Sequence, residues 1–234
     1  MNNRTTFRML AVLLLAAAWV PWHAHAAERA VMIATPAVDD PKAAGSAQTL
    51  VLSGGCFWGV QGVYEHVRGV RRAIAGYAGG GLNTAHYDQV GTGRTGHAES
   101  VQISFDPAQI SVGELLQIFF SVVQDPTQLN GQGPDTGPQY RSEIWYGNAT
   151  QKQIAEAYIA QLDQSHVFRK PIVTRVDALP GFFPAEGYHQ DFLVHNPTYP
   201  YIVYNDLPKI ENLKRLFPAY YVPQPTLVSN VISR

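Results

Sequence analysis

The sequence contains only one cysteine, Cys56, among its 234 residues. A single cysteine excludes a disulfide within the chain. It also argues against zinc, because zinc sites take several cysteine and histidine ligands and no two histidines here have the i, i+4 spacing of a helical metal site. Only 15% of the residues are charged and the formal net charge is −1, so nothing indicates a nucleic-acid-binding protein. The 46% of hydrophobic residues is typical of a globular protein.

Long hydrophobic runs are also absent. The apolar run over residues 9–20 is about twelve residues long, whereas a membrane-spanning helix needs roughly 20. Arg4 and Arg8 precede this run, and an Ala-His-Ala triplet at residues 24–26 follows it, which is typical of a cleaved secretory signal peptide. We therefore predict a signal peptide over residues 1–26, no stable membrane insertion, and a location in the periplasm or outside the cell.

The length that remains suits one domain with a substantial core. Residues 27–48 are rich in alanine, proline and aspartate, and we predict that they form a flexible lead-in. Residues 49–234 are then expected to form a single domain that ends in an extended C-terminal tail.

Hydrophobic periodicity and turn residues predict strands and helices that mix without a regular βαβ repeat. The predicted strands cover residues 49–52, 71–77, 101–105, 142–146 and 172–176, and the predicted helices cover residues 56–66, 111–123, 150–164 and 208–217. A capping box at Ser111 and Glu114 begins the second helix, and Thr150 is expected to cap the third. Long stretches between these elements are rich in glycine, proline and aromatic residues. We therefore predict an α+β fold whose long loops build a site.

Cys56 lies where a glycine turn, Gly54-Gly55, joins the first strand to the first helix. A cysteine in this position faces unpaired backbone N–H groups and the positive end of the helix dipole, so we expect a lowered pKa. The structural alternative is that Cys56, Phe57 and Trp58 all pack into the core. Consecutive helical residues point about 100° apart, so both rings cannot lie on one apolar stripe. One of the two rings is therefore expected to line a cavity, which favours a functional cysteine.

Further candidate groups lie in two other segments. Glu99 enters a strand, and it becomes a candidate proton donor only if burial raises its pKa. Asp135, Tyr140 and Arg141 fall in one turn, where the structural alternative is an ion pair between Arg141 and Asp135. Residues 91–96 match GxGxxG, but a strand rather than a helix follows them, so they do not indicate a dinucleotide site.

Six short stretches occur in one order along residues 49–217. They are Gly55-Cys56-Phe57-Trp58-Gly59, Gly76-Tyr77-Ala78-Gly79-Gly80, Thr95-Gly96-His97-Ala98-Glu99, Asp125-Pro126-Thr127, residues 135–142 with Gln-Tyr-Arg-Ser, and Ala185-Glu186-Gly187-Tyr188-His189-Gln190. Together they strongly resemble the methionine sulfoxide reductase A family. The resemblance implies an α+β two-layer sandwich related to the ferredoxin-like arrangement, with long loops wrapped around it.

The same resemblance implies a role for each matching residue. The implied catalytic residues are Cys56 as the nucleophile, Glu99 as the acid, Tyr87 and Tyr140 as hydrogen-bond donors to the sulfoxide oxygen, and Asp135 as a residue that positions water and neighbouring groups. Phe57 and Trp58 would form the apolar wall that holds the substrate methyl group. Aromatic rings suit this task because methyl groups and thioether-like sulfur pack favourably against them.

The implied reaction reduces the S epimer of methionine sulfoxide, free or in oxidised proteins, to methionine. A thiolate attacks the sulfur while the oxygen is protonated, and Cys56 becomes a sulfenic acid that needs a thiol to return. Part of the family has further cysteines near the C-terminus, but residues 195–204 contain none here. We therefore expect no bound cofactor, and recycling by an external thioredoxin-like, glutaredoxin-like or small thiol. A monomer is also expected.

Two other classes of function fit the same residues. A single-cysteine peroxidase would share the activated thiol and the sulfenic acid, but it would consume peroxide far faster than it reduced sulfoxide. An exported peptide-binding module would use the aromatic residues as a cleft and leave Cys56 inert. Mass spectrometry after one equivalent of methionine sulfoxide distinguishes this binding module from an enzyme, because an inert cysteine gains no oxygen.

Overall fold

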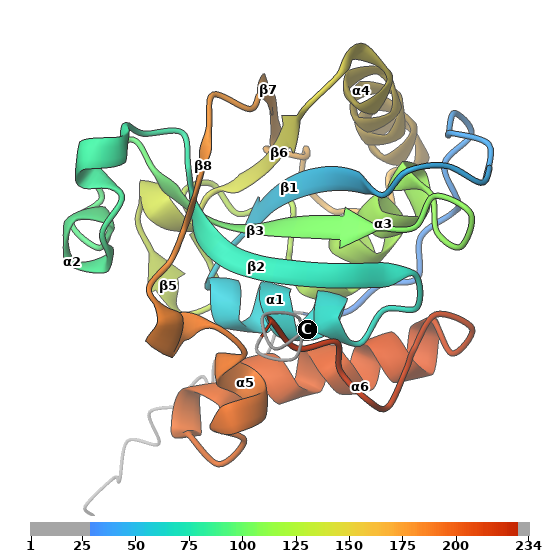
Figure 1. The fold of residues 1–234 in the computed structure, drawn as a ribbon. Coiled ribbons are helices and arrows are strands. Elements are labelled where there is room, and N and C mark those ends of the chain that lie inside the picture. The colour runs from blue at the N-terminus through green and yellow to red at the C-terminus, as the bar shows by residue number, and fades with distance from the viewer. Residues whose placement is uncertain (1–28, 229–234) are drawn as a thin grey trace, which may run out of the picture.

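The structure is a computed structural model that describes residues 29–228, so the predicted signal peptide lies outside the described residues. A curled six-stranded sheet forms the centre of the fold, with strand order β7-β6-β1-β3-β2-β8 (Figure 1). The strands are β1 (Gln48–Gly54), β2 (Val70–Ala78), β3 (Ala98–Phe105), β6 (Ser142–Tyr146), β7 (Arg175–Ala178) and β8 (Phe182–Pro184). All neighbours are antiparallel except β6 and β7, which are parallel. A separate hairpin pairs β4 (Gly131–Gln132) with β5 (Asp135–Thr136).

Helices pack around this sheet and confirm a mixed α+β fold. The α-helices are α1 (Phe57–Glu65), α2 (Tyr87–Val90), α3 (Val112–Ile118), α4 (Ala149–Ser165), α5 (Phe192–His195) and α6 (Leu207–Leu216). Two π-helical segments, Phe119–Val123 and Ile202–Asp206, continue α3 and precede α6. Short 3-10 turns cover Leu82–Thr84, Pro138–Tyr140 and Gly187–His189. Figure 1 shows α1 below the sheet, and α5 and α6 on the side of α1 that faces away from the sheet.

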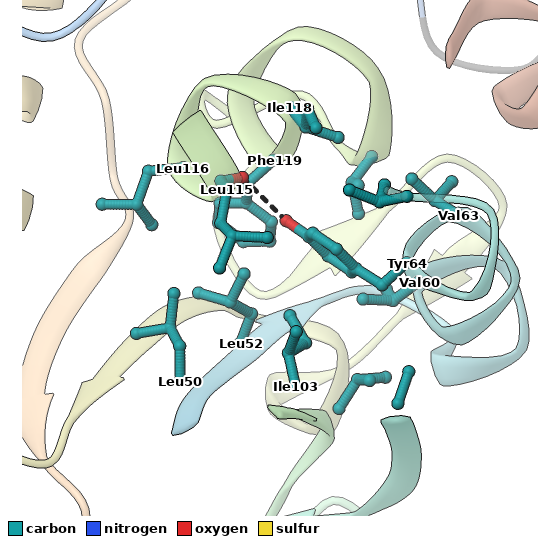
Figure 2. Close-up of a cluster of buried hydrophobic side chains, with 14 of the residues drawn as sticks. Leu50, Leu52, Val60, Val63, Tyr64, Ile103, Leu115, Leu116, Ile118 and Phe119 are labelled. Atoms are coloured by element: carbon teal, nitrogen blue, oxygen red, sulfur yellow. Dashed lines mark hydrogen bonds between the residues drawn. The ribbon is translucent and has the colours of Figure 1, made fainter. Parts of the chain in front are cut away.

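Helix α1 is buried on almost every side because the sheet covers one face and the C-terminal helices cover the other. Val60 and Val63 pack with Leu50 and Ile103 from the sheet (Figure 2). The ring of Tyr64 is fully buried, and its hydroxyl donates a hydrogen bond of 2.9 Å to the Leu115 carbonyl oxygen of α3. The helix that carries the cysteine at its start is therefore held rigidly inside the core.

Several predicted element boundaries need correction. The third predicted helix begins at Ala149, because the side chain of Asn148, rather than Thr150, caps it by accepting a hydrogen bond from the Gln151 N–H. The strand predicted at 172–176 begins only at Arg175, as β7. The Val173 N–H donates to the Pro126 carbonyl oxygen, so Val173 does not take part in the sheet. The capping box of Ser111 and Glu114 is confirmed.

Residues 29–47, which composition marked as a flexible lead-in, make specific contacts with α3 and α4. Ile33 is only 3% exposed, and its carbonyl accepts a hydrogen bond from Gln117. The Tyr158 hydroxyl donates to the Ala34 carbonyl at 2.6 Å. Asp39 accepts hydrogen bonds from Ser111 and from the Gly113 N–H at the start of α3. The segment is thus tied to the helix layer, which composition could not reveal.

Candidate functional site

Cys56 is the N-cap of α1 and follows β1 directly through the predicted glycine turn. Gly55 has a φ of +92°, and a Cβ there would lie 2.7 Å from the Cβ of Gln132, so only glycine fits this turn. The Cys56 side chain is a free thiol that is 9% exposed, and it makes no capping hydrogen bond at the start of α1. The local path of the chain therefore places the sulfur at the first turn of the helix, as the sequence predicts.

The prediction of a lowered cysteine pKa is wrong for this structure. Burial raises the pKa of the Cys56 thiol well above its usual value, and the charges of Glu99 and Asp206 raise it further. The backbone N–H of Trp58 acts in the opposite direction and does not outweigh these effects. Cys56 is consequently a neutral thiol in the protein without substrate.

Glu99 meets the condition under which it becomes a candidate proton donor. It lies near the start of β3, is 3% exposed, and its Oε2 accepts a hydrogen bond of 3.0 Å from the Phe57 N–H. Burial raises the pKa of its carboxyl from 4.5 to about 8, and the Phe57 bond lowers it only in part. The carboxyl is therefore protonated at neutral pH, and it binds the backbone N–H of the residue that follows Cys56.

Tyr87 and Tyr140 reach the same region from α2 and from the 3-10 turn Pro138–Tyr140. Burial and the Glu99 charge raise the pKa of Tyr87 to about 12. Burial also raises the pKa of Tyr140, and Glu99, Asp135 and Cys56 contribute to this rise. Both phenols therefore keep their protons at neutral pH and can donate hydrogen bonds. The structure brings these two residues together with the cysteine, as the resemblance implies.

Asp135 has a different partner from the one that its local sequence suggested. The Tyr201 hydroxyl donates a short hydrogen bond to its carboxylate, whereas Arg141 pairs with Glu143. Burial raises the pKa of Asp135, and the bond from Tyr201 opposes this shift. Tyr201 was not a sequence candidate because it lies about 66 residues from Asp135, with no motif to connect them.

The two aromatic rings after the cysteine point in different directions, as consecutive positions in a helix require. Phe57 is 1% exposed and packs against Tyr77 and His189, with centroid distances of 5.9 and 5.0 Å. Trp58 is half-buried and stacks on Phe192 of α5 at 3.9 Å, and its indole N–H donates to His189 Nδ1 at 3.1 Å. The ring that remains accessible beside the cysteine is therefore Trp58.

Asp206 and Lys209 form a buried pair that sequence analysis missed. Asp206 is 0% exposed at the end of the π-helical segment, and its Oδ1 lies 3.6 Å from Lys209 Nζ. Burial raises the pKa of Asp206 to about 6, and the Lys209 charge limits the rise. The spacing of three residues could have indicated an ion pair, but nothing in the sequence places it beside Cys56.

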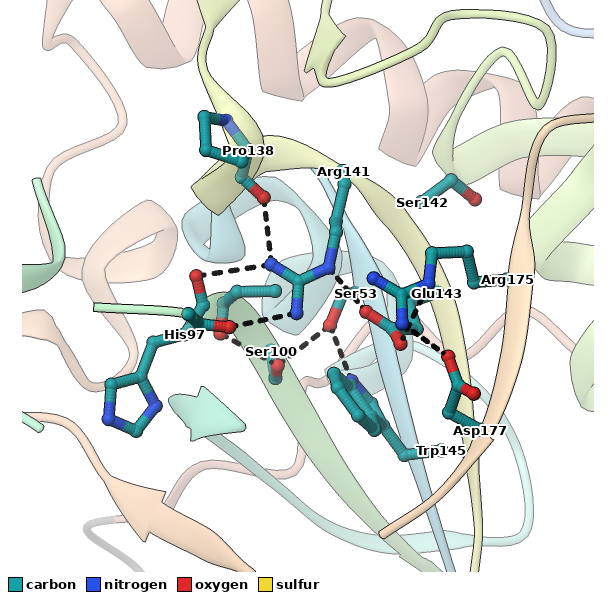
Figure 3. A network of polar contacts seen from close by, with 12 residues as sticks. Ser53, His97, Ser100, Pro138, Arg141, Ser142, Glu143, Trp145, Arg175 and Asp177 are labelled. Carbon is teal, nitrogen blue, oxygen red and sulfur yellow. Dashed lines mark hydrogen bonds and ion pairs between the residues drawn. The ribbon is translucent and has the colours of Figure 1, made fainter. Parts of the chain in front are cut away.

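Arg141 ties the residues just before β3, the strand of Glu99, to the 3-10 turn Pro138–Tyr140 (Figure 3). Its guanidinium donates to the carbonyl oxygens of Gly96, His97 and Pro138 at 3.0, 3.2 and 2.9 Å. Its Nε lies 2.5 Å from Glu143 Oε2, and both side chains are buried. The position of the acid and of one phenol thus depends on one charged side chain.

Replacing Arg141 with methionine is expected to destabilise the fold by about 3–5 kcal/mol, because it leaves Glu143 as a buried and poorly compensated charge. Urea unfolding followed by circular dichroism measures this loss. Arg175→Met is the matched control: Arg175 also pairs with Glu143, at 3.6 Å, but its side chain is 58% exposed. That variant is expected to lose only about 0–1 kcal/mol. Equal losses of unfolding free energy in the two variants would contradict the proposal that Arg141 is the main partner of the buried Glu143 charge.

Within residues 29–228, no cluster of three or more histidine, cysteine, aspartate or glutamate side chains could hold a metal ion. Over the same part of the chain, no helix is both long enough and apolar enough to cross a bilayer. A buried thiol beside a protonated carboxyl, two phenols and an accessible indole therefore makes up the site. Such a site on this α+β fold defines a cysteine-based oxidoreductase.

Comparison with known proteins identifies the family. The family model described as peptide methionine sulfoxide reductase matches residues 48–219. Peptide methionine sulfoxide reductase MsrA 2 from Mesorhizobium japonicum is 60% identical over 189 residues, covering 81% of this chain and 97% of that protein. The protein of the same name from Synechocystis sp. is 52% identical over 167 residues, covering 71% and 78%. The chain belongs to the peptide methionine sulfoxide reductase family, and it is a thiol-dependent enzyme that reduces methionine-S-sulfoxide.

Solved structures agree with this assignment. The reduced form of Mxr1 from Saccharomyces cerevisiae superposes with a TM-score of 0.59 at 30% identity, covering 72% of this chain and 94% of that one. Methionine sulfoxide reductase A of Corynebacterium diphtheriae gives a TM-score of 0.57 at 32% identity, covering 68% and 79%. The α+β fold and the family expected from the sequence are therefore both confirmed.

Proposed function

We propose that Cys56 attacks the sulfur of methionine-S-sulfoxide while Glu99 delivers a proton to the sulfoxide oxygen. The observation that carries this proposal is the buried Glu99 carboxyl, which stays protonated up to a pH of about 8 and accepts the Phe57 N–H next to the cysteine. A sulfoxide oxygen leaves sulfur readily only when it is protonated, so a neutral acid beside the nucleophile supplies what the reaction needs.

The proposed step balances without a bound cofactor. The Cys56 sulfur donates an electron pair, the bond between the substrate sulfur and its oxygen breaks, and the oxygen ends on Cys56 as a sulfenic acid. The substrate sulfur is reduced to a thioether. Glu99 protonates the oxygen, and the proton lost by the thiol restores Glu99 over the whole step. The sum is thiol plus sulfoxide giving sulfenic acid plus thioether.

The remaining residues are proposed to hold the substrate. Tyr87 and Tyr140 keep their protons and donate hydrogen bonds to the oxygen as its negative charge grows. Phe57 and Trp58 form the wall against the S-methyl group. Asp135, held by Tyr201, positions water and its neighbours. These roles follow from the family motifs together with the closeness of the groups.

We propose an external thiol as the reductant, because the sequence has no second cysteine. A donor thiol attacks the Cys56 sulfenic acid and releases water, which leaves a mixed disulfide, and a second thiol, on the same donor or on another donor molecule, then frees Cys56. Thioredoxin-like, glutaredoxin-like and small thiols all have the chemistry for this step. Oxidised proteins and free methionine sulfoxide are the proposed substrates of a monomeric enzyme.

Two further features of the protein stand as proposals. The order β1-α1-β2-β3-α3-β6 along the chain and the order β6-β1-β3-β2 in the sheet support a relation to the ferredoxin-like arrangement. The charged, apolar and Ala-His-Ala segments of residues 1–26 support export to the periplasm or beyond. N-terminal sequencing of the protein recovered from its native host tests the second proposal, since an intact Met1 would contradict it.

A stereochemical assay tests the function directly. The protein lacking residues 1–26 is given the S and R epimers of a blocked methionine sulfoxide with dithiothreitol, glutathione plus glutaredoxin, or thioredoxin with its reductase. Only the S epimer is expected to be consumed. Without reductant, we expect one thioether per enzyme and one added oxygen on Cys56 by mass spectrometry. Equal use of both epimers, or product without an oxygen on Cys56, would contradict the proposal.

The protonation of Glu99 can be observed without turnover. The carboxyl holds its proton below a pH of about 8 and loses it above, because its pKa is raised to that value by burial. Infrared titration is expected to show a protonated carboxyl band that disappears near this pH and is absent in Glu99→Gln. Glu65 is the internal control, since its buried carboxyl has a pKa raised to about 9 and gives a separate band that Glu65→Gln removes. A Glu99 band that disappears near pH 4–5 would rule out its role as the acid.

A further inference from the structure

The C-terminal segment brings a buried carboxylate against the helix that carries the cysteine. A Cβ added to Gly59 would lie 2.1 Å from Asp206 Oδ1, so the carboxylate occupies the space that a side chain at this position would fill. Gly59 is three residues after Cys56, and residues at this spacing share one face of a helix. Asp206 therefore lies against the first turn of α1, near enough to Cys56 for its charge to act on the thiol.

This carboxylate is unusually poorly stabilised for a buried acid. Asp206 is 0% exposed, and both of its oxygens are buried without a hydrogen bond. Its contact with Lys209 is an ion pair at 3.6 Å, which is longer than a hydrogen bond. Lys209 is itself 6% exposed, so water screens neither charge. A negative charge in such surroundings acts strongly on its neighbours.

After Glu99, Asp206 is the acid with the largest effect on Cys56, and its charge persists at neutral pH. Glu99 has a pKa of about 8 and is neutral there, whereas Asp206 has a pKa of about 6 and is ionised. The other titratable groups that act on Cys56 or Asp206 are Asp135 of β5, Tyr87 of α2, Tyr140 of the 3-10 turn, Tyr201 before the π-helical segment and Lys209 of α6. Asp135 contributes least to the shift of the thiol, and the phenols are neutral.

We propose that the Asp206 carboxylate, held by Lys209 against the first turn of α1, adds to burial in keeping Cys56 in its thiol form when no substrate is bound. Asp206 is then a positioning residue that acts through the cysteine. The inference rests on the proposed function, in which Cys56 is the nucleophile. Thiolates, rather than thiols, react with peroxide, and a lone cysteine has no partner within the chain to rescue it. Suppressing the free thiolate therefore protects the nucleophile until a sulfoxide is in place.

The pH profile of Cys56 alkylation tests this inference and needs no sulfoxide. The rate of modification by iodoacetamide is followed by mass spectrometry in the wild type, Asp206→Asn and Asp88→Asn. The wild-type midpoint is expected above the ordinary cysteine value of about 8.5. The midpoint of Asp206→Asn is expected about one pH unit lower than that of the wild type, which makes oxidation of Cys56 by hydrogen peroxide at pH 7 about tenfold faster. Asp88, an exposed acid of α2, is the matched control and is expected to leave both measurements unchanged.

Several results would overturn the inference. One is a midpoint in Asp206→Asn that equals or exceeds that of the wild type. Another is a wild-type midpoint at or below about 8.5, which needs no variant and therefore decides even if Asp206→Asn fails to fold. Sulfoxide reduction is measured separately on the same wild-type protein. Its absence together with the expected alkylation shift would contradict the proposed function alone, and reduction without the shift would contradict this inference alone.

Discussion

Replacing Cys56 with serine is expected to lower the rate of S-sulfoxide reduction by at least about 10⁴-fold. A serine hydroxyl is a far weaker nucleophile than a thiolate, and its oxygen cannot take up the oxygen atom that sulfur holds in a sulfenic acid. The sequence offers no other cysteine to replace it. Product formation with dithiothreitol in excess measures the loss. The size of this effect follows from the removal of the thiol sulfur that attacks the substrate and accepts its oxygen.

The same variant separates nucleophilic catalysis from a role of the site in binding alone. Serine is close to cysteine in size, so circular dichroism and thermal unfolding are expected to show an intact fold, although Cys56 is only 9% exposed. Wild-type protein treated with one equivalent of the S epimer is expected to react with a sulfenic acid reagent at one position, whereas Cys56→Ser is expected not to react. A folded variant that keeps a rate within tenfold of the wild type would remove Cys56 from the nucleophile's role.

The start of the site could be predicted because it depends on neighbours in the sequence. A buried strand, a glycine turn and a helix place Cys56 at the N-cap, and Gly55 confirms this with a backbone conformation that requires glycine. The capping box at Ser111 follows from a spacing of three residues. These features rest on local backbone geometry and on propensities that the sequence shows directly.

The electrostatics of the site could not be predicted, because they depend on segments far apart in the chain. The helix start alone suggests a lowered thiol pKa, but burial of the thiol and the charges of Glu99 and Asp206 reverse the direction. The bond between Tyr201 and Asp135 and the burial of Glu99 likewise arise only when the chain folds. Family motifs identified the acid and the phenols, whereas the tail that carries Tyr201 and Asp206 lay outside those motifs.

Replacing Glu99 with glutamine is expected to reduce turnover by about 10²–10⁴-fold, the contribution typical of a positioned general acid. The change is nearly isosteric, and the amide oxygen can still accept the Phe57 N–H that the carboxylate accepts at 3.0 Å. What is lost is the acidic proton, because an amide does not give one up at neutral pH. The variant is therefore expected to fold and to keep a reactive Cys56, while its rate of thioether formation falls.

Glu65→Gln is the matched control for this experiment. Glu65 is also a fully buried glutamate with a raised pKa, but it lies at the last turn of α1, at the opposite end from Cys56. The same loss of a buried acidic proton at that position is expected to change turnover by less than about threefold, because Glu65 faces Asp191 rather than the site. A comparable fall in turnover in both variants would show that buried carboxyls in this core affect turnover by stabilising the fold rather than by donating a proton. A fall confined to Glu99→Gln assigns the proton to Glu99, since its carboxyl binds the N–H of the residue after Cys56 whereas Glu65 lies at the far end of α1.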